Sequence, residues 1–246
     1  MIEKEWHALC NIVADSMRLH TRPFVTPLIQ DVIGKEPEVG TGTYIDLSGC
    51  SILTCQHVAI LEPFLHQFHG GDNFPSLPVK WRDLGVKFDV AVGSIPDKHW
   101  RSAPHQAQLL GLERFAPAHR PVDREMLFFR GISGENVTIG NFHSRVTPTA
   151  YCSQEIPGGG DATSFDIHWE PSMMTVTSGT APEVAEVFKH YETGGFSGSL
   201  VWNTRFVELG CNLSTWSPND AVVTGVNGRV KVGQRAAQNV ATLGSV

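Results

Sequence analysis

The spacing of apolar residues changes near residue 23, where a helical pattern gives way to short runs. Before that point, apolar side chains recur every three or four positions, at Ile2, Trp6, Leu9, Val13 and Met17. This spacing puts them on one face of a helix, so the pattern predicts a short amphipathic N-terminal helix over residues 1–23. The Arg-Pro pair at positions 22 and 23 ends the helix, because the residue before a proline is disfavoured in helical conformation.

From residue 24 onward, apolar runs of a few residues alternate with turn-forming residues. A run such as Ser51–Thr54 is too short for a helix, and many runs of this kind follow one another at regular spacing. That pattern predicts an all-β sandwich or barrel. A polar stretch with three prolines, residues 101–122, predicts a connection between two β halves. We therefore expect one barrel over residues 24–105, a second over 122–228, and a C-terminal tail over 229–246.

The composition fits a folded, turn-rich chain and excludes two kinds of partner. The 246 residues include 24 glycines and 15 prolines, and 41% of them are hydrophobic, which is enough to bury a core. The 19 basic and 25 acidic residues give a net charge of −6 and form no basic block. A nucleic-acid partner is therefore not expected. No apolar stretch approaches the ~20 residues of a membrane span, so no membrane contact is expected either.

The N-terminal residues and the cysteines predict a cytoplasmic protein. No basic flank followed by an apolar run opens the sequence, so no secretory signal is visible. The five cysteines include no Cys-x-x-Cys pair, and we expect them to be reduced thiols; they are Cys10, Cys50, Cys55, Cys152 and Cys211.

Three segments carry the residue types of nucleophilic catalysis, in the order His, Asp, Ser. His57 follows a short apolar run, Asp89 opens another, and Ser197 lies within Gly-Gly-Phe-Ser-Gly. A serine hydroxyl becomes a nucleophile when an imidazole accepts its proton, and that imidazole needs a carboxylate to fix its tautomer. Glycines beside the serine allow a sharp turn in which two backbone N–H groups converge on one oxygen.

These segments resemble the trypsin/chymotrypsin-like serine peptidases, in particular the shorter bacterial members of the high-temperature-requirement type. The resemblance is carried by Gly40-Thr-Gly-Thr-Tyr, Leu53-Thr-Cys-Gln-His-Val, Asp89-Val-Ala-Val and Gly195-Phe-Ser-Gly-Ser. It runs over residues 24–226 and implies an all-β fold of two antiparallel six-stranded barrels behind the short helix. It also implies a serine endopeptidase that hydrolyses peptide bonds through an acyl-enzyme intermediate.

The resemblance assigns a role to each matching residue. It implies that His57 is the general base, that Asp89 orients it, and that Ser197 is the nucleophile, with the N–H groups of Gly195 and Ser197 as the oxyanion hole. The family binds a protein or peptide substrate beside the serine and along the strand that follows it. The implied substrate-binding residues are Tyr191, Glu192, Leu209, Gly210, Cys211, Asn212 and Leu213.

Three positions depart from the family pattern. Phe196 stands where members have Asp or Asn, Ser199 where they have Gly, and Val58 where secreted members have Cys. In pancreatic-type members the Asp pairs with a freshly cut N-terminus and so assembles the site. Phe196 offers no carboxylate, so we expect no activation of that kind. We expect control by loops such as Gly158–Asp161, or by a regulatory protein partner.

Two alternatives follow from the same residues. Phe196 and Ser199 allow a catalytically weak or inactive barrel that acts as a binding module. An α/β-hydrolase is excluded, because its triad requires a histidine after the serine and none follows Ser197. His66 and His69 have no Cys or acid set beside them, so we expect neither a metal nor a cofactor.

Overall fold

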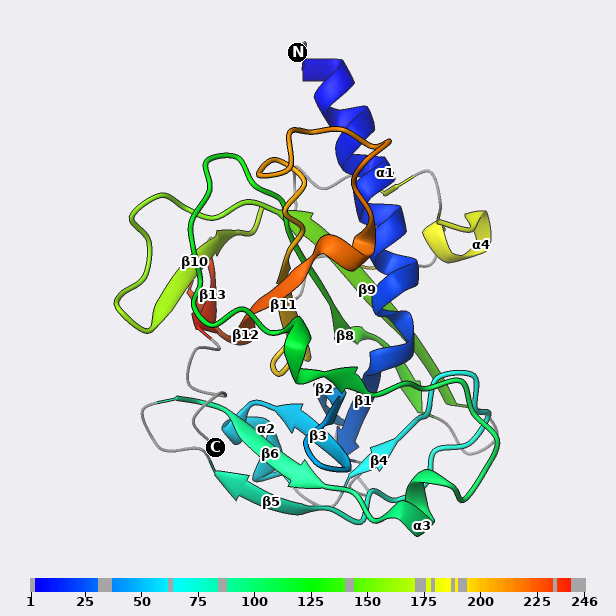
Figure 1. The fold of residues 1–246 in the computed structure, drawn as a ribbon. Coiled ribbons are helices and arrows are strands. Elements are labelled where there is room, and N and C mark those ends of the chain that lie inside the picture. Colours follow the sequence, from blue (N-terminus) through cyan, green and yellow to red (C-terminus); the bar gives the residue numbers. More distant parts are fainter. Residues whose placement is uncertain are drawn as a thin grey trace.

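The computed structural model describes residues 3–30, 37–61, 64–83, 88–139, 144–170, 176–177, 180–186, 189, 194–231 and 234–239. Within these residues the chain forms one long helix, α1, followed by two mostly antiparallel sheets (Figure 1). The predicted fold class, an all-β protein behind an N-terminal helix, is confirmed.

Helix α1 spans Glu3–Thr21 and lies against the second sheet (Figure 1). Val13 and Met17 are fully buried, as the helical spacing of the apolar residues predicts. The helix ends where the Thr21 hydroxyl donates a hydrogen bond to the Met17 carbonyl, and a short 3-10 turn, η1 (Arg22–Phe24), leads into the first strand.

The first sheet contains seven strands: β1 (Val25–Gln30), β2 (Glu38–Asp46), β3 (Cys50–Thr54), β4 (Leu65–His66), β5 (Lys80–Asp83), β6 (Ala91–Ser94) and β7 (Leu110–Gly111). Two short helices, α2 (Gln56–Ala59) and α3 (Asp97–Trp100), lie in the connections between these strands. The strand order is β4-β1-β2-β3-β6-β5, and β7 pairs in parallel with β2. The residues just before β5 also pair with β4, through a bridge between Leu65 and Ser76 and a bond from Leu77 N–H to the Phe64 carbonyl. These contacts close the sheet into a barrel.

The second sheet contains six strands: β8 (Leu127–Ile139), β9 (Ser144–Ser153), β10 (Ser164–His168), β11 (Leu200–Asn203), β12 (Val222–Lys231) and β13 (Gln234–Asn239). Their order is β10-β13-β12-β11-β8-β9. Residues just after β9 pair with β10, because Ile156 N–H donates to the Asp166 carbonyl at 2.8 Å and Glu155 bridges Ile167. This sheet therefore also closes on itself. A 3-10 turn, η2 (Leu112–Arg114), lies in the chain between the first and the second sheet. In the second sheet, α4 (Pro182–Ala185) lies in the connection from β10 to β11, and η4 (Pro218–Asp220) in the connection from β11 to β12.

The C-terminal residues correct one prediction. Residues 229–246 were expected to form a tail, but residues 229–231 complete β12, and β13 lies between β10 and β12 in the second sheet. The sequence of β13, Gln-Arg-Ala-Ala-Gln-Asn, has no apolar alternation, so its pairing comes from the backbone of both neighbours. Residues 240–246 lie outside the described residues.

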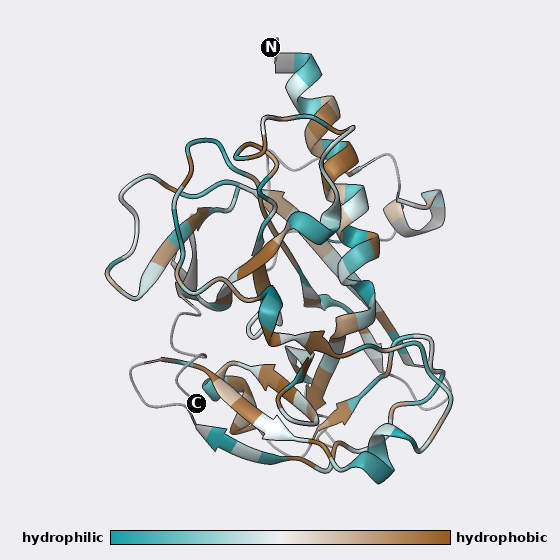
Figure 2. Ribbon diagram, viewed as in Figure 1, coloured by the Kyte–Doolittle hydropathy of each residue, from teal (hydrophilic) through white to brown (hydrophobic). Residues whose placement is uncertain are grey.

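One apolar cluster joins the helix and both sheets. It includes Val13 of α1, Tyr44 and Ile52 of the first sheet, and Phe128 and Trp202 of the second. A second cluster, around Phe129, lies within the second sheet. Figure 2 shows hydrophobic residues concentrated along the strands, with hydrophilic residues in many of the turns. Because the larger cluster crosses from sheet to sheet, it fixes their relative position.

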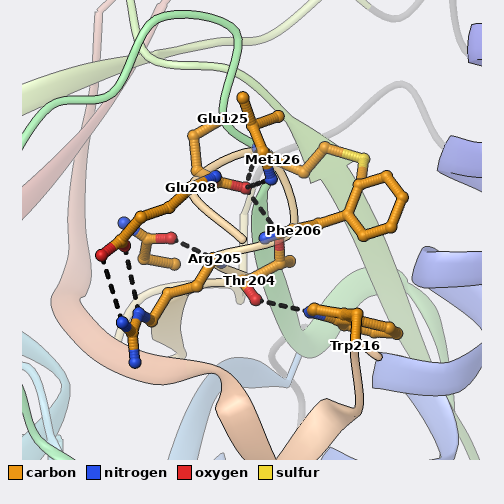
Figure 3. A network of polar contacts seen from close by, with 9 residues as sticks. Glu125, Met126, Thr204, Arg205, Phe206, Glu208 and Trp216 are labelled. Carbon is orange, nitrogen blue, oxygen red and sulfur yellow. Dashed lines mark hydrogen bonds and ion pairs between the residues drawn. The ribbon is translucent and has the colours of Figure 1, made fainter. Parts of the chain in front are cut away.

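A buried carboxylate holds the turn that follows β11 (Figure 3). Glu125 is 3% exposed and accepts hydrogen bonds from the N–H of the next residue, from the Thr204 hydroxyl at 2.9 Å, and from the N–H groups of Val207 and Glu208. Trp216 donates its indole N–H to the Thr204 carbonyl. Four donors thus satisfy an acid that would otherwise be costly to bury.

Candidate active site

His57 and Asp89 meet beside the end of β3 and the start of β6, two adjacent strands of the first sheet. His57 lies in α2, directly after β3, and Asp89 lies two residues before β6, which pairs with β3. Asp89 Oδ2 is 2.5 Å from His57 Nδ1, and Asp89 Oδ1 accepts the backbone N–H of His57 at 3.0 Å. Both carboxylate oxygens therefore hold the same residue. The bond to Nδ1 leaves His57 Nε2 available as a proton acceptor.

The predicted serine lies on a sharp turn that directly precedes β11. Gly195 and Gly198 flank it with φ angles of +94° and +90°, a region that residues with a side chain rarely adopt. A Cβ on Gly198 would lie 2.1 Å from the Thr41 carbonyl oxygen and 3.1 Å from Cys55 N. Gly198 is thus packed against the chain segment that leads to His57, and only glycine fits there.

Three carbonyls of the serine turn accept hydrogen bonds from the surrounding scaffold. The Gly194 carbonyl accepts from Gly134 N–H at 2.9 Å, the Gly195 carbonyl from the Thr41 hydroxyl at 2.8 Å, and the Ser197 carbonyl from Thr41 N–H at 2.9 Å. By contrast, the N–H groups of Gly195 and Ser197 donate no hydrogen bond within the described part of the chain. These are the two N–H groups that the sequence predicts as the oxyanion hole.

Thr41 links the two sheets to this turn, and the sequence analysis did not single it out. The residue is fully buried in β2. Its hydroxyl accepts the N–H of Ile132, in β8, at 2.9 Å while donating to Gly195, and its carbonyl accepts the Thr54 hydroxyl. In the sequence, Thr41 is marked only by its place in Gly40-Thr-Gly, one of the segments that carry the resemblance.

The Ser197 hydroxyl donates to the Gly228 carbonyl at 3.1 Å. Among the described residues, no hydrogen bond joins it to His57. Gly228 lies on β12, beside the turn, because Asn227 of the same strand accepts Gly198 N–H and donates to the Ser199 carbonyl. The serine turn therefore packs through Gly198 against Cys55, two residues before His57, and the Ser197 hydroxyl is directed toward β12.

Cys55, two residues before His57, faces β12 of the second sheet. Its thiol donates to the Asn227 carbonyl at 3.0 Å, and one ligand atom each of Cys55, His57 and Asp89 lie within 4.8 Å of one another. Within the described residues, this group is the one that offers three metal ligands. The hydrogen bond between His57 and Asp89 already occupies two of them. None of the five cysteines forms a disulfide bond.

Phe196 fills an apolar site beneath the turn. It is fully buried and packs edge-on against Phe129 at 5.8 Å and Tyr151 at 5.2 Å between ring centroids, with Trp169 at 6.0 Å. The position that carries a carboxylate in pancreatic-type peptidases is therefore lined here by aromatic rings.

The predicted substrate-binding residues are not gathered at the turn. Tyr191 and Glu192 lie outside the described residues. Residues 209–213 were expected to form the strand after the serine, but they form turns beside α1, at the top of Figure 1. The strand that follows β11 is β12, from Val222. Both segments contain Gly-x-Asn, at Gly210 and again at Gly225, and only the second is a strand.

The first barrel contains a buried histidine that the site does not use. The side chain of His66 is fully buried; its Nδ1 lies 2.7 Å from the Tyr44 hydroxyl and its Nε2 lies 2.7 Å from His99 Nε2. Burial, with smaller contributions from His99 and His105, lowers the pKa of His66 to about 3. His66 is therefore neutral at pH 7, which suits a packing role.

Comparisons with known proteins show the fold. No protein-family model matches the chain, and no curated protein sequence matches it. Among solved structures, a serine endoprotease from Yersinia pestis aligns with 95% of this chain and 64% of its own, at a TM-score of 0.53 and 15% identity. The structure of GrC aligns with 92% of each chain, at a TM-score of 0.54 and 11% identity. This chain thus has the fold of the chymotrypsin-like proteases. No helix among the described residues is long and apolar enough to cross a membrane.

Proposed function

We propose that this protein is a serine endopeptidase, with Ser197 as the nucleophile, His57 as the general base and Asp89 as the group that orients it. The observation that carries the proposal is the double contact of Asp89 with His57 at the edge where the serine turn packs. In the chymotrypsin-like fold this pairing fixes the imidazole tautomer that accepts a proton from serine.

The proposed reaction starts when the Ser197 hydroxyl turns from the Gly228 carbonyl toward His57 Nε2. His57 takes the proton as the oxygen attacks the peptide carbonyl carbon, and the carbonyl oxygen becomes an oxyanion. The N–H groups of Gly195 and Ser197 donate to this oxyanion. His57 then gives its proton to the leaving amine, and water, deprotonated in turn by His57, hydrolyses the acyl-enzyme.

The substrate backbone is proposed to bind along β12 at Gly228, in place of the segment 209–213. The pairing of β12 with β13 shifts register between Asn227 and Val230, so the ladder is interrupted at Gly228. Its carbonyl, which here accepts the Ser197 hydroxyl, is then available to a peptide N–H once that hydroxyl has turned. Tyr191 and Glu192 remain proposed as residues near the primary pocket, and the cytoplasm as the proposed location.

A second candidate is a catalytically inactive barrel that binds a peptide without cleaving it. The observation that supports this second candidate is the orientation of the Ser197 hydroxyl toward the Gly228 carbonyl.

Cleavage of an unfolded protein separates the two candidates. The purified chain should produce new termini in a denatured substrate, as detected by mass spectrometry, and Ser197→Ala should produce none. Ser214→Ala is the matched control, because Ser214 bonds Asn212 in an exposed turn and should cleave like the wild type. Equal cleavage by Ser197→Ala would refute the serine mechanism, and no cleavage by any of the three proteins would favour the binding module.

A further inference from the structure

A buried arginine that has no acidic partner among the described residues lies on the outer side of the second sheet, against α1. Arg130, in β8, is 7% exposed. Its Nη1 donates to the Arg18 carbonyl, in the last turn of α1, at 3.2 Å. Its Nε is buried without a hydrogen-bond partner among the described residues. Among the described residues, the Arg18 carbonyl is thus the one hydrogen-bond acceptor of the Arg130 guanidinium, a group with five N–H donors and a full positive charge.

The groups around Arg130 are also basic. Burial, and to a smaller extent the charges of Arg18 and Arg22, lowers the pKa of Arg130 to about 9. Burial, Arg22 and Arg130 together lower the pKa of His69. Arg18 forms an ion pair with Asp15 at 3.4 Å, but no ion pair within the described residues involves Arg130 or Arg22.

Such an arrangement is unfavourable in the protein alone. A buried charge is costly unless a charge of opposite sign and hydrogen bonds compensate it. The C-terminal end of α1 supplies a partial negative charge, which accounts for one hydrogen bond. The remaining positive charge stands out in a chain whose net charge is −6. A bound anion would supply the missing compensation.

We propose that Arg130, Arg22 and His69 form a binding site for a phosphate-type oxyanion. Guanidinium groups match the spacing of phosphate oxygens and bind them through paired hydrogen bonds. Arg130 is buried and Arg22 is exposed, so Arg22 is the member of the site that solvent reaches. The bound anion connects η1, β8 and the loop after β4, and so ties the helix end to both sheets. This inference does not depend on the proposed peptidase activity.

Thermal unfolding at constant ionic strength, with sodium phosphate replacing sodium chloride, tests the site. The melting temperature should rise saturably, by roughly 5 °C or more at a phosphate concentration about 100-fold above its Kd. Arg130→Met should remove the saturable rise. Without phosphate it should melt no lower than the wild type, because it removes an uncompensated buried charge.

Two further variants keep the test decisive. Arg22→Gln changes an exposed residue, so it should fold normally and weaken phosphate binding about tenfold in titration calorimetry. Arg101→Gln is the matched control, because Arg101 is exposed and pairs with Asp97 outside this cluster; it should bind like the wild type.

Phosphate also stabilises proteins by exclusion from their surface. A rise that does not saturate and persists unchanged in Arg130→Met and Arg22→Gln would refute the site. An equal response to acetate would refute the phosphate class. Titration with a phosphoserine peptide identifies the source of the anion: tighter binding than inorganic phosphate supports a phosphorylated protein, and equal binding supports the free anion.

Discussion

Replacing Thr41 by valine tests whether one buried hydroxyl holds the serine turn. Valine has nearly the same shape, so the packing of β2 is kept. The substitution removes two hydrogen bonds, from Ile132 N–H at 2.9 Å and to the Gly195 carbonyl at 2.8 Å. Each orphaned buried group costs about 1–3 kcal/mol, so the free energy of unfolding should fall by about 3 kcal/mol. Urea unfolding measures this loss, with an unchanged m-value.

The same substitution should lower kcat more than it changes KM. Releasing the Gly195 carbonyl lets the neighbouring peptide groups rotate, and the loss of one oxyanion donor costs on the order of 10²–10³ in kcat; partial loss should cost roughly tenfold or more. Thr41→Ser keeps the hydroxyl and should recover most of the rate. Thr43→Val is the matched control, because Thr43 is equally buried in β2 and its hydroxyl has no partner among the described residues. If Thr41→Val and Thr43→Val behave alike in both assays, the proposed role of Thr41 is wrong.

Four other outcomes follow from the structure. Asp89→Asn should reduce kcat/KM by several orders of magnitude, because the amide favours the wrong tautomer of His57; a rate within tenfold of wild type in a peptide assay would contradict this role. Glu125→Gln should lower the free energy of unfolding by about 3 kcal/mol, because an amide NH₂ then faces N–H donors, and an unchanged urea midpoint would contradict it. Phe196→Asp should lower the free energy of unfolding by about 4 kcal/mol in the same assay, because it buries a carboxylate among aromatic rings. An unchanged free energy of unfolding would mean that the new carboxylate finds an ion-pair partner, and would contradict this prediction. The pKa of His66 is about 3 in the folded protein, below its value in the unfolded chain. Its contribution to the free energy of unfolding is therefore complete above about pH 6.5 and is lost as the pH falls, by about 3 kcal/mol near pH 4. His66→Gln should make the free energy of unfolding depend less on pH between about pH 6.5 and pH 4.

The sequence predicted what local patterns encode. The helical spacing of Val13 and Met17 predicted α1, and short apolar runs predicted the strands. The pairing of His57 with Asp89 was also predictable, because each lies at the end of an apolar run in a recognisable motif. Adjacent strands then bring the two residues together.

Contacts between distant segments could not be predicted in this way. The hydroxyl of Thr41 bonds residues 91 and 154 positions away, and nothing near Thr41 in the sequence marks either partner. Strand β13 was missed because its polar residues are held by backbone pairing on both sides. The substrate-binding strand was expected at residues 209–213, but the strand that follows β11 is β12. Glu125, 79 positions before Thr204, holds residues 204–208 in a turn, and nothing in the sequence near these residues indicates that contact.

Labelling with a fluorophosphonate tests the central proposal most directly, since the reagent reacts with a serine hydroxyl that a neighbouring base activates. The intact wild-type chain should gain the mass of one adduct, and peptide mapping should place it on Ser197. Ser197→Ala should gain none, and Asp89→Asn should react far more slowly. A chain that stays unlabelled, or that carries the adduct on another serine, would contradict the assignment of Ser197, His57 and Asp89 as a catalytic triad.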